Sequence, residues 1–263
     1  MSAARSLVTP LVLTYNEEAN IERTLARLDW AERIVVVDSR STDRTVALCQ
    51  ARPNVEVVER AFDNHVAQWN YGLAQVKTEW VLSLDADYVL SPPFVTELER
   101  WQPAADVHGY RAAFDYCVFG HALRASLYPP RVVLFRKDRA TFVADGHTQL
   151  LQLEGEPGAF QARIQHDDRK SLDRWFAEQW RYAGLEARHL TEAPPDRLRS
   201  IDRMRRRAVL APALVGLYAL IGRGLVWDGW PGWHYVWQRV VAESLLSLRL
   251  VDQRLRGTVG KAE

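Results

Sequence analysis

Four short apolar runs divide the first ninety residues of this 263-residue chain into repeating units. The segments between them carry apolar residues at helical spacing, as in residues 64–76. Strands that are apolar on both faces are typical of a parallel sheet covered by helices on both sides. The sequence therefore predicts an α/β fold with a mostly parallel sheet, whose strands occupy residues 7–14, 34–37, 55–58 and 80–84.

Three of these runs end in polar residues, at positions 14–17, 38–39 and 85–87. Ligands of such sheets bind beyond the carboxyl ends of the strands, where these residues would gather. Alternate residues of an extended strand face the same side, so Asp85 and Asp87 can converge on one point. Two carboxylates there suit a divalent cation that is also held by substrate phosphates. The alternative is a pair of ordinary strand-end turn residues.

Glycine is absent from the chain before Gly72. Dinucleotide-binding loops and P-loops need glycine where the backbone approaches phosphate closely. Both are therefore excluded from the first strand–helix units. If this region binds phosphate, a metal ion held by Asp87 is the natural means.

Helix starts are expected at polar residues that can cap a first turn. Asn16 is expected to cap a helix with two glutamates in its first turn, where carboxylates suit the helix dipole. Ser41 or Thr42 is expected to cap the next helix. Another should begin at residues 91–93, because proline is tolerated in a first turn.

The pattern changes after residue 108. Short alternating runs over residues 108–165 predict brief strands and loops that complete the sheet, and residues 171–189 predict a helix. A Pro194-Pro195 break follows. We expect one catalytic domain over residues 1–190 and a C-terminal helical segment over residues 191–263.

Charge and composition exclude several classes of protein. The net charge of +1 implies no general attraction to nucleic acid. Cys49 and Cys117 form neither a metal-binding pattern nor a disulfide framework. No signal peptide is expected at the N-terminus. A run of 18 or more apolar residues is absent, so no transmembrane helix is expected.

Three segments together resemble the family 2 glycosyltransferases of the GT-A fold. The resemblance is closest to the bacterial glucosyltransferase branch that acts on lipopolysaccharide core and related envelope glycans. It implies a nucleotide-diphospho-sugar transferase with a Rossmann-like, mostly parallel sheet, helices on both faces and a C-terminal helical segment. The residues that carry it are 14–18, 36–43 and 84–87, with further likeness at 30–33, 68–70 and 227–232.

The resemblance implies roles for individual residues. Asp38 would hydrogen-bond the base, typically uracil, which makes a UDP-sugar the expected donor. Asp87, with Asp85 and His166, would hold Mg²⁺ or Mn²⁺, and the alternative for His166 is a loop histidine without a ligand role. The other residues expected around the nucleotide sugar are Thr14, Tyr15, Asn16, Glu17, Ser39, Arg40, Gln68, Asn70 and Asp85.

The sequence differs from the family it resembles at the expected position of the general base. Relatives often carry a His-Glu pair where this chain has His147 and Thr148. A threonine hydroxyl cannot act as a base near neutral pH, so Asp145 is the candidate base. His147 would position the acceptor or act as base itself. The alternative is that Asp145 is only a turn residue before Gly146.

Two other positions depart from the family. Arg40 replaces the usual glycine, and it would either reach donor phosphate or point to solvent. Trp69 replaces a lysine that is common in this branch, and it is expected to pack rather than bind.

The C-terminal segment has the composition of a membrane-interface element. Six arginines between residues 197 and 207 precede the apolar stretch 208–221, which is too short to span a bilayer. Tryptophan is favoured at the interface because its ring is apolar and its N–H is polar. We expect residues 197–237 to contact the inner face of the cytoplasmic membrane; the alternative is a buried helix with a solvated basic face. The tryptophans are Trp227, Trp230, Trp233 and Trp237.

The leading hypothesis is an inverting, metal-dependent glycosyltransferase that is cytoplasmic and peripheral on the membrane. Its acceptor would be a hydroxyl of a lipid-linked or envelope glycan. One alternative is transfer to polyprenyl phosphate, which needs little help from a base. The other is a non-catalytic sugar-nucleotide-binding scaffold at the membrane.

Overall fold

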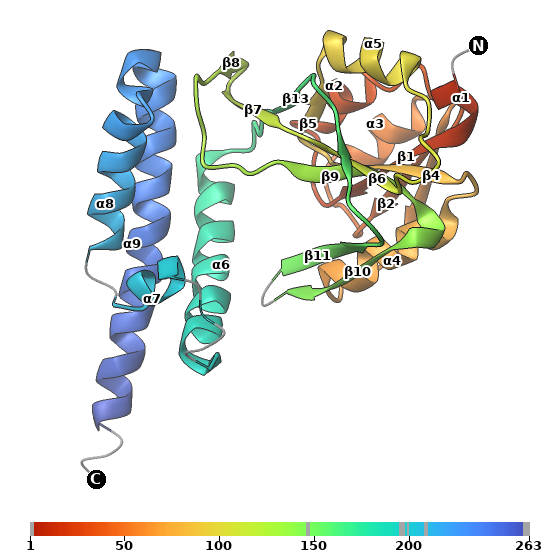
Figure 1. Ribbon diagram of the computed structural model, residues 1–263. Helices are drawn as coiled ribbons and strands as arrows, with labels where there is room; N and C mark the ends of the chain where they lie inside the picture. The colour runs from red at the N-terminus through yellow and green to blue at the C-terminus, as the bar shows by residue number, and fades with distance from the viewer. Residues whose placement is uncertain (1–2, 146–147, 195–197, 199, 208–209, 260–263) are drawn as a thin grey trace. The chain divides into compact units, whose positions relative to one another are not determined.

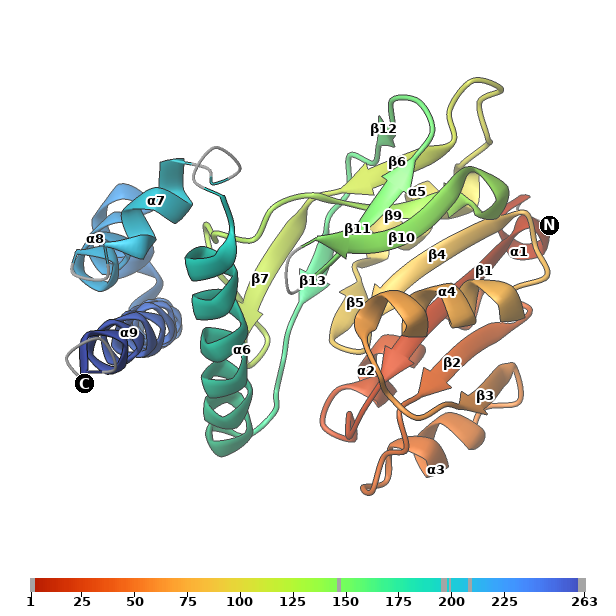
Figure 2. The same cartoon turned by 90° about the horizontal axis from the view of Figure 1, so that it is seen from below.

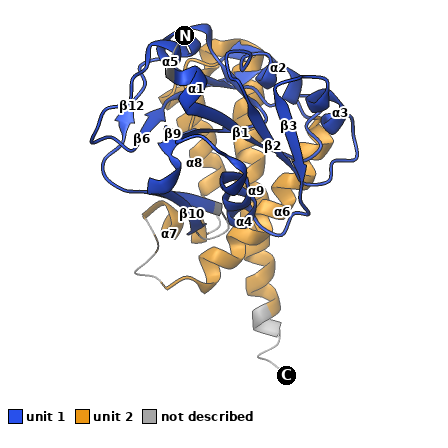
Figure 3. Cartoon of the chain, turned by 90° about the vertical axis from the view of Figure 1, so that its right-hand side faces the viewer, with its two compact units in different colours: residues 1–122, 128–170 blue, residues 123–127, 171–263 orange. Residues whose placement is uncertain are grey.

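The structure is a computed structural model that describes residues 3–145, 148–194, 198, 200–207 and 210–259. The chain divides into two compact units, coloured separately in Figure 3. Unit 1 comprises residues 1–122 and 128–170, and unit 2 comprises residues 123–127 and 171–263. The division falls at residue 170, ahead of the boundary at 190 that the sequence predicts, because the long helix that begins at Leu172 groups with the C-terminal helices.

Unit 1 is built on a seven-stranded sheet of order β12-β6-β9-β4-β1-β2-β3 (Figures 1 and 2). Strands β4, β1, β2 and β3 are parallel, and β9 is antiparallel to both of its neighbours. This confirms the mostly parallel sheet. The first four strands are β1 (Val8–Thr14), β2 (Ile34–Asp38), β3 (Val55–Glu59) and β4 (Trp80–Asp85).

Strand β1 lies between β4 and β2 and tolerates a proline. Its pairing with β4 starts at Val8, whereas its pairing with β2 starts only at Leu11. Pro10 therefore precedes the ladder with β2, where the missing N–H of proline does least harm.

Two apolar cores cover the two faces of this sheet. Even-numbered β1 residues, such as Val12, pack with α1 (Ala3–Leu7), α2 (Ile21–Leu25), α3 (Thr45–Gln50) and α5 (Pro92–Arg100). Leu11 packs on the opposite face with α4 (His65–Gln75). The alternation follows from the two-residue period of a strand.

Helix α4 confirms the predicted apolar face. Trp69 and Leu73 are buried against the sheet, and the ring of Trp69 stacks on Phe142 with centroids 5.0 Å apart. Trp69 therefore packs, as predicted. Asn64 caps the helix by accepting a hydrogen bond from Ala67 N, and Ser91 caps α5 in the same way, so both predicted starts are confirmed.

The predicted caps of the first two helices are wrong. Asn16 has a left-handed backbone (φ 54°), and α2 starts only at Ile21. The Asn16 side chain instead accepts a hydrogen bond from Thr42 N. Helix α3 starts at Thr45. Ser41 does not cap it and instead donates a hydrogen bond to Asp38. In both places the polar residues serve loop-to-loop contacts.

The region after residue 108 forms short strands, as predicted. Strand β9 extends the main sheet, β10 and β11 form a hairpin, and a four-stranded sheet has the order β5-β13-β7-β8. These strands are β5 (Tyr88–Leu90), β6 (Gly109–Ala112), β7 (Phe114–Val118), β8 (His121–Ala122), β9 (Arg131–Arg136), β10 (Ala140–Asp145), β11 (Thr148–Leu153), β12 (Gly158–Ala159) and β13 (Ile164–His166), with a 3₁₀ turn at Lys137–Arg139.

Unit 2 is helical. Arg205 lies between two acidic side chains and ties three helices together, with its guanidinium 2.7 Å from Glu186 and 3.0 Å from Glu243. Within the described residues no helix is long and apolar enough to cross a membrane. The elements are α6 (Leu172–Glu192), α7 (Ser200–Arg206), α8 (Ala211–Leu217), η2 (Tyr218–Gly222), η3 (Leu225–Asp228) and α9 (Gly229–Val259).

Candidate functional site

The Asp85-Ala86-Asp87 segment lies at the carboxyl edge of the parallel strands. Asp85 is the last residue of β4, and Asp87 lies in the turn before β5. Thr24 Oγ1 donates to Ala86 O at 2.7 Å, and Asp167 N donates to Asp87 O at 3.1 Å. Hydrogen bonds from two distant segments thus fix the turn that carries the paired carboxylates.

His166 lies directly against Asp87. Its Nε2 is 3.2 Å from Asp87 Oδ2, and three tyrosine rings surround the imidazole. Burial raises the pKa of Asp87, but the charge and the hydrogen bond of His166 outweigh it and lower that pKa. Burial likewise lowers the pKa of His166, and Asp87 raises it above its usual value.

This pair contains buried polar atoms that no described residue satisfies. Asp87 Oδ1 and His166 Nδ1 are both buried, and neither has a hydrogen-bond partner among the described residues. A buried acceptor without a partner is costly unless something else binds it. Across the part of the chain that the structure describes, no three His, Cys, Asp or Glu side chains form a complete metal site. Asp87 and His166 fit Mg²⁺ or Mn²⁺ if donor phosphates complete the coordination.

Asp38 anchors the loop beside this turn. It is completely buried, and its carboxylate accepts hydrogen bonds from Thr14 Oγ1 at 2.8 Å and from Ser41 Oγ at 2.6 Å. Ser41 N donates to its other oxygen at 2.7 Å. Hydrogen bonds to a carboxylate contribute about 1.5–3 kcal/mol each, so this residue orders the loop. Its contact with a base stays a prediction.

Gln68 and Asn70 extend from α4 in different directions. Gln68 is buried and donates to Ser39 Oγ at 3.0 Å, which joins it to the Asp38 loop. Asn70 instead donates to Phe142 O at 2.9 Å and accepts from Phe142 N at 3.1 Å. The structure therefore gives Asn70 a part in holding β10, and donor binding by Asn70 stays a prediction.

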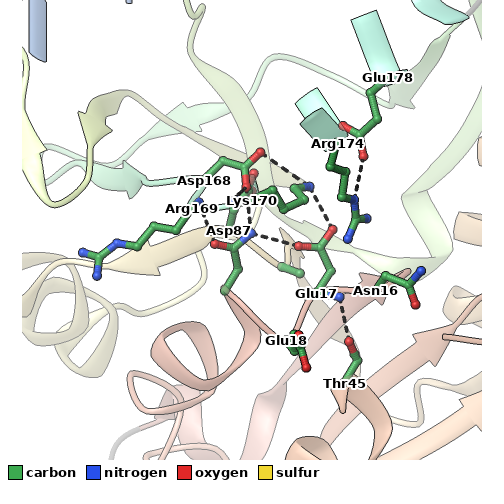
Figure 4. Close-up of polar contacts among 12 residues, drawn as sticks. Asn16, Glu17, Glu18, Thr45, Asp87, Asp168, Arg169, Lys170, Arg174 and Glu178 are labelled. Atoms are coloured by element: carbon green, nitrogen blue, oxygen red, sulfur yellow. Dashed lines mark hydrogen bonds and ion pairs between the residues drawn. The ribbon is translucent and has the colours of Figure 1, made fainter. Parts of the chain in front are cut away.

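A buried polar network around Glu17 includes residues that the sequence analysis did not single out (Figure 4). Lys170 Nζ lies 3.0 Å from Glu17 Oε1 and 3.5 Å from Asp168 Oδ2. Asn20 Nδ2 donates to both Glu17 at 2.9 Å and Asp168 at 2.8 Å. The run of four charged residues after His166 was the available sequence signal. The network ties that run to the loop after β1.

Burial dominates the titration of Glu17. It raises the pKa of Glu17 to about 7, and the opposing charge of Lys170 offsets only part of this rise.

The proposed base lies at the end of a strand of the β10–β11 pair. Asp145 is the last residue of β10, and its backbone pairs with Thr148 of β11. His147 lies outside the described residues, as does the side chain of Asp145. Their roles stay predictions.

Arg40 adopts the conformation that a glycine would favour. Its φ is 63°, in the left-handed region, and its side chain is exposed. Arg40 thus keeps the loop conformation that the usual glycine would adopt, at a cost of about 1 kcal/mol or more in backbone strain.

One cavity of about 660 Å³ lies away from these residues. It is lined by residues in and directly after α5, in β6, and in and directly after β12, including Pro92, Trp101, Tyr110 and Phe160. None of the predicted site residues lines this cavity. The residues described above lie instead at the ends of the parallel strands.

Residues 11–142 match the family model for glycosyl transferase family 2, which is half of the chain. The chain belongs to glycosyl transferase family 2. Its sheet with helices on both faces is accordingly the GT-A fold that the sequence predicted.

Two relatives show the extent of the likeness. An uncharacterized glycosyltransferase of Rickettsia bellii is 33% identical over 93 residues, which cover 35% of this chain and 31% of the relative. The lipopolysaccharide core biosynthesis glycosyltransferase LpsC of Rhizobium meliloti is 28% identical over 136 residues, covering 50% and 48%. The match therefore spans about a third to a half of these relatives.

Two solved structures are also similar. TarS of S. aureus with UDP-GlcNAc is 16% identical with a TM-score of 0.48, covering 96% of this chain and 92% of the other. Glucosyl-3-phosphoglycerate synthase of Mycobacterium tuberculosis, with Mn²⁺, UDP and glucosyl-3-phosphoglycerate, is 21% identical with a TM-score of 0.34, covering 43% and 45%. Both scores lie below 0.5, and the family assignment rests on the sequence match.

Replacing Arg40 by glycine should raise the free energy of unfolding by roughly 0.5–1 kcal/mol, because left-handed strain is relieved. Urea denaturation measures this change. Arg44→Gly is the matched control, since Arg44 has a φ of −80° and gains no such relief. A lower stability for Arg40→Gly would contradict the expectation.

Glu17 should make stability fall as pH rises from about 4.5 to 7. Over this window the folded chain retains a proton that the unfolded chain has already released, so rising pH favours unfolding. Urea denaturation at pH 5, 6, 7 and 8 should show wild type losing stability relative to Glu17→Gln. Glu18→Gln, which alters the exposed neighbouring carboxyl, is the control. A constant difference between wild type and Glu17→Gln would be the contrary result.

Proposed function

We propose that this chain transfers a sugar from a nucleoside-diphosphate sugar, a UDP-sugar, to a hydroxyl of a lipid-linked or envelope glycan. The observation that carries the proposal is the Asp87–His166 pair beside Asp85, with orphaned buried atoms on both members. Family membership supports the same reaction class. The reaction is proposed to be metal-dependent and inverting.

The nucleotide would bind at the ends of β1 and β2. The β1–β2 register places Thr14 opposite Asp38, and Ser39 N donates to Thr14 O at 2.9 Å. The ring of Tyr15 is 53% exposed, and an aromatic ring is a surface on which a base can stack. The residues proposed around base, ribose and phosphate are Thr14, Tyr15, Asn16, Glu17, Asp38, Ser39, Arg40, Gln68 and Asp85.

The diphosphate would bind at the adjacent turn. Asp87 and His166, with Asp85 nearby, would hold Mg²⁺ or Mn²⁺. Such an ion stabilises the charge that develops on a nucleoside diphosphate as it leaves. The surrounding protein keeps the two side chains fixed, because Tyr88, Tyr116 and Tyr128 leave the imidazole little freedom.

In the inverting reaction the acceptor oxygen forms a bond to the anomeric carbon as the bond to the diphosphate breaks. The proton of the acceptor hydroxyl must pass to a base during this step. Asp145 is proposed as that base, with His147 as its alternative or as the residue that positions the acceptor. Asp145 is the last residue of β10, and the assignment rests on the resemblance to the family.

Asp87→Asn should abolish the metal-dependent part of donor binding and lower transfer roughly a hundredfold or more, since several kcal/mol of charge stabilisation are lost. A thermal-shift panel of nucleotide sugars with and without Mn²⁺ tests binding, because a ligand of the native state raises Tm. Asp138→Asn, at an exposed aspartate of unit 1, is the control. Transfer that survives both Asp87→Asn and EDTA would disprove the metal mechanism. Binding without turnover on any envelope fraction would favour the scaffold.

We further propose that unit 2 contacts a membrane surface. Apolar side chains on one side of α8 and η2 are exposed, at the helical spacing of residues 210, 214, 217, 218 and 221. Trp227 and Trp230 are 76% and 84% exposed. An apolar surface of this kind is unusual on a soluble protein, and Arg203, Arg207 and Arg223 are exposed in the same unit.

Part of the predicted basic segment has another role. Arg205 forms ion pairs with Glu186 and Glu243, so its charge is balanced inside unit 2. Arg197 and Arg199 lie outside the described residues. The proposed location, peripheral on the inner face of the cytoplasmic membrane, therefore rests mainly on the exposed apolar residues.

The double variant Ile221→Ser, Trp230→Ser should bind anionic liposomes at least about tenfold more weakly than wild type, because two large apolar side chains are lost from the interface. Sedimentation with phosphatidylglycerol liposomes at low salt measures binding. Leu150→Ser, at a 51% exposed leucine of unit 1, is the control. Failure of the wild type to sediment would overturn the proposal.

A further inference from the structure

Arg131 is a cation beside the paired aspartates that the proposed donor site does not use. It is the first residue of β9, and β9 pairs with β4 in an antiparallel register that joins Trp80 to Arg136 and Leu82 to Leu134. Ser83 Oγ donates to Val133 O at 3.3 Å, so the same alignment continues beyond the paired residues. The last paired residues are Leu82 and Leu134, and Arg131 lies beyond them on β9, toward the end of β4 that carries Asp85.

The guanidinium of Arg131 rests on an aromatic surface. It lies 4.9 Å from the centre of the Tyr128 ring, and the Tyr128 hydroxyl shares a hydrogen bond with the Tyr88 hydroxyl. Tyr128 also contacts His166, with ring centroids 4.5 Å apart. Arg131 is thereby positioned next to the proposed metal ligands by packing.

Within the described part of the chain, no carboxylate forms an ion pair or a hydrogen bond with the Arg131 guanidinium. The arginine is nevertheless in a strongly electrostatic environment, because Tyr88, Tyr128, Asp85 and Asp87 together raise its pKa despite the opposing effect of burial. Other arginines of unit 1 are paired, such as Arg136 with Glu79 at 2.7 Å and Arg163 with Asp115 at 2.5 Å. A guanidinium that no carboxylate of the described residues pairs with is available to a ligand.

The position of Arg131 separates it from the nucleotide. Strand β4 has β1 on one side and β9 on the other, as Figure 2 shows. The proposed base and ribose residues lie at the ends of β1 and β2. Arg131 lies across β4 from them, on the side of Asp85 and Asp87 that the proposed nucleotide does not occupy. Its planar fork of N–H donors matches the geometry of phosphate oxygens.

We infer that the acceptor carries a phosphate group, which Arg131 binds on the β9 side of the Asp85-Ala86-Asp87 turn with the Tyr128 hydroxyl beside it. This inference rests on the proposed function, since it divides one site between a donor and an acceptor. It narrows the acceptor class to glycans that carry a phosphate group in addition to the reacting hydroxyl. Arg131 is a specificity-determining residue in this account.

The test separates donor binding from acceptor binding in the full chain. UDP is first titrated with Mn²⁺ by calorimetry, and methyl phosphate is then titrated into the UDP–Mn²⁺ complex. Wild type should bind methyl phosphate, and Arg131→Ala should bind it at least about tenfold more weakly while binding UDP no less tightly. Arg131→Lys retains the charge without the planar fork and should give an intermediate affinity.

Arg111→Ala is the matched control, because Arg111 is an exposed arginine on β6, the strand next to β9. It should bind methyl phosphate as wild type does. Acetate distinguishes a carboxylate acceptor from a phosphate acceptor, and preference for acetate would overturn the inference. So would loss of UDP affinity in Arg131→Ala, which would make Arg131 a donor residue, or absence of methyl phosphate binding in a wild type that binds UDP. A wild type that binds no UDP would instead defeat the proposed function.

Discussion

The parallel register of β4, β1 and β2 is the constraint on which the candidate site depends. It places Leu13 level with Asp85 and Thr14 level with Asp38, so three chain segments far apart in sequence end at one edge. Parallel strands bring their carboxyl ends together only when helices return the chain across the sheet faces. The two apolar cores on those faces therefore keep the strand ends aligned, although they are not part of the site. A one-residue slip of β4 would turn Asp85 to the opposite face.

Buried polar groups then refine the arrangement at this edge. Asp38 organises the loop after β2, and the Glu17–Asn20–Lys170 network joins the loop after β1 to the segment after β13. Each buried charge is expensive to desolvate, and hydrogen bonds or an opposite charge offset that cost. Asp87 and His166 are different, because an atom of each has no partner in the part of the chain that the structure describes. Unsatisfied buried atoms of this kind are what the proposed metal site would use.

Unit 2 differs from unit 1 because it leaves many large apolar side chains exposed. Its interior is held by Leu190, Leu246 and Leu250 and by the Arg205 ion triad, yet large apolar side chains remain on its surface. Burying them in water-free surroundings would release several kcal/mol, at about 25 cal/mol per Å² of apolar area. The exposed face of α8 and η2 thus suits a surface that the chain alone does not provide.

The sequence by itself determined the α/β fold, the strands and the edge at which the polar residues gather, because strand burial and strand-end chemistry are local patterns. It also predicted the packing role of Trp69, since a large aromatic at a helical apolar position has few alternatives. Tertiary structure alone decided where short polar side chains point. Asn16, Ser41 and Thr42 are good helix caps by propensity, but contacts between two loops compete for the same hydrogen bonds and prevail. The pairing of Glu17 with Lys170, and the pairing of β4 with β9 that brings Arg131 toward Asp85, depend on segments more than forty residues apart, which no local pattern can bring together.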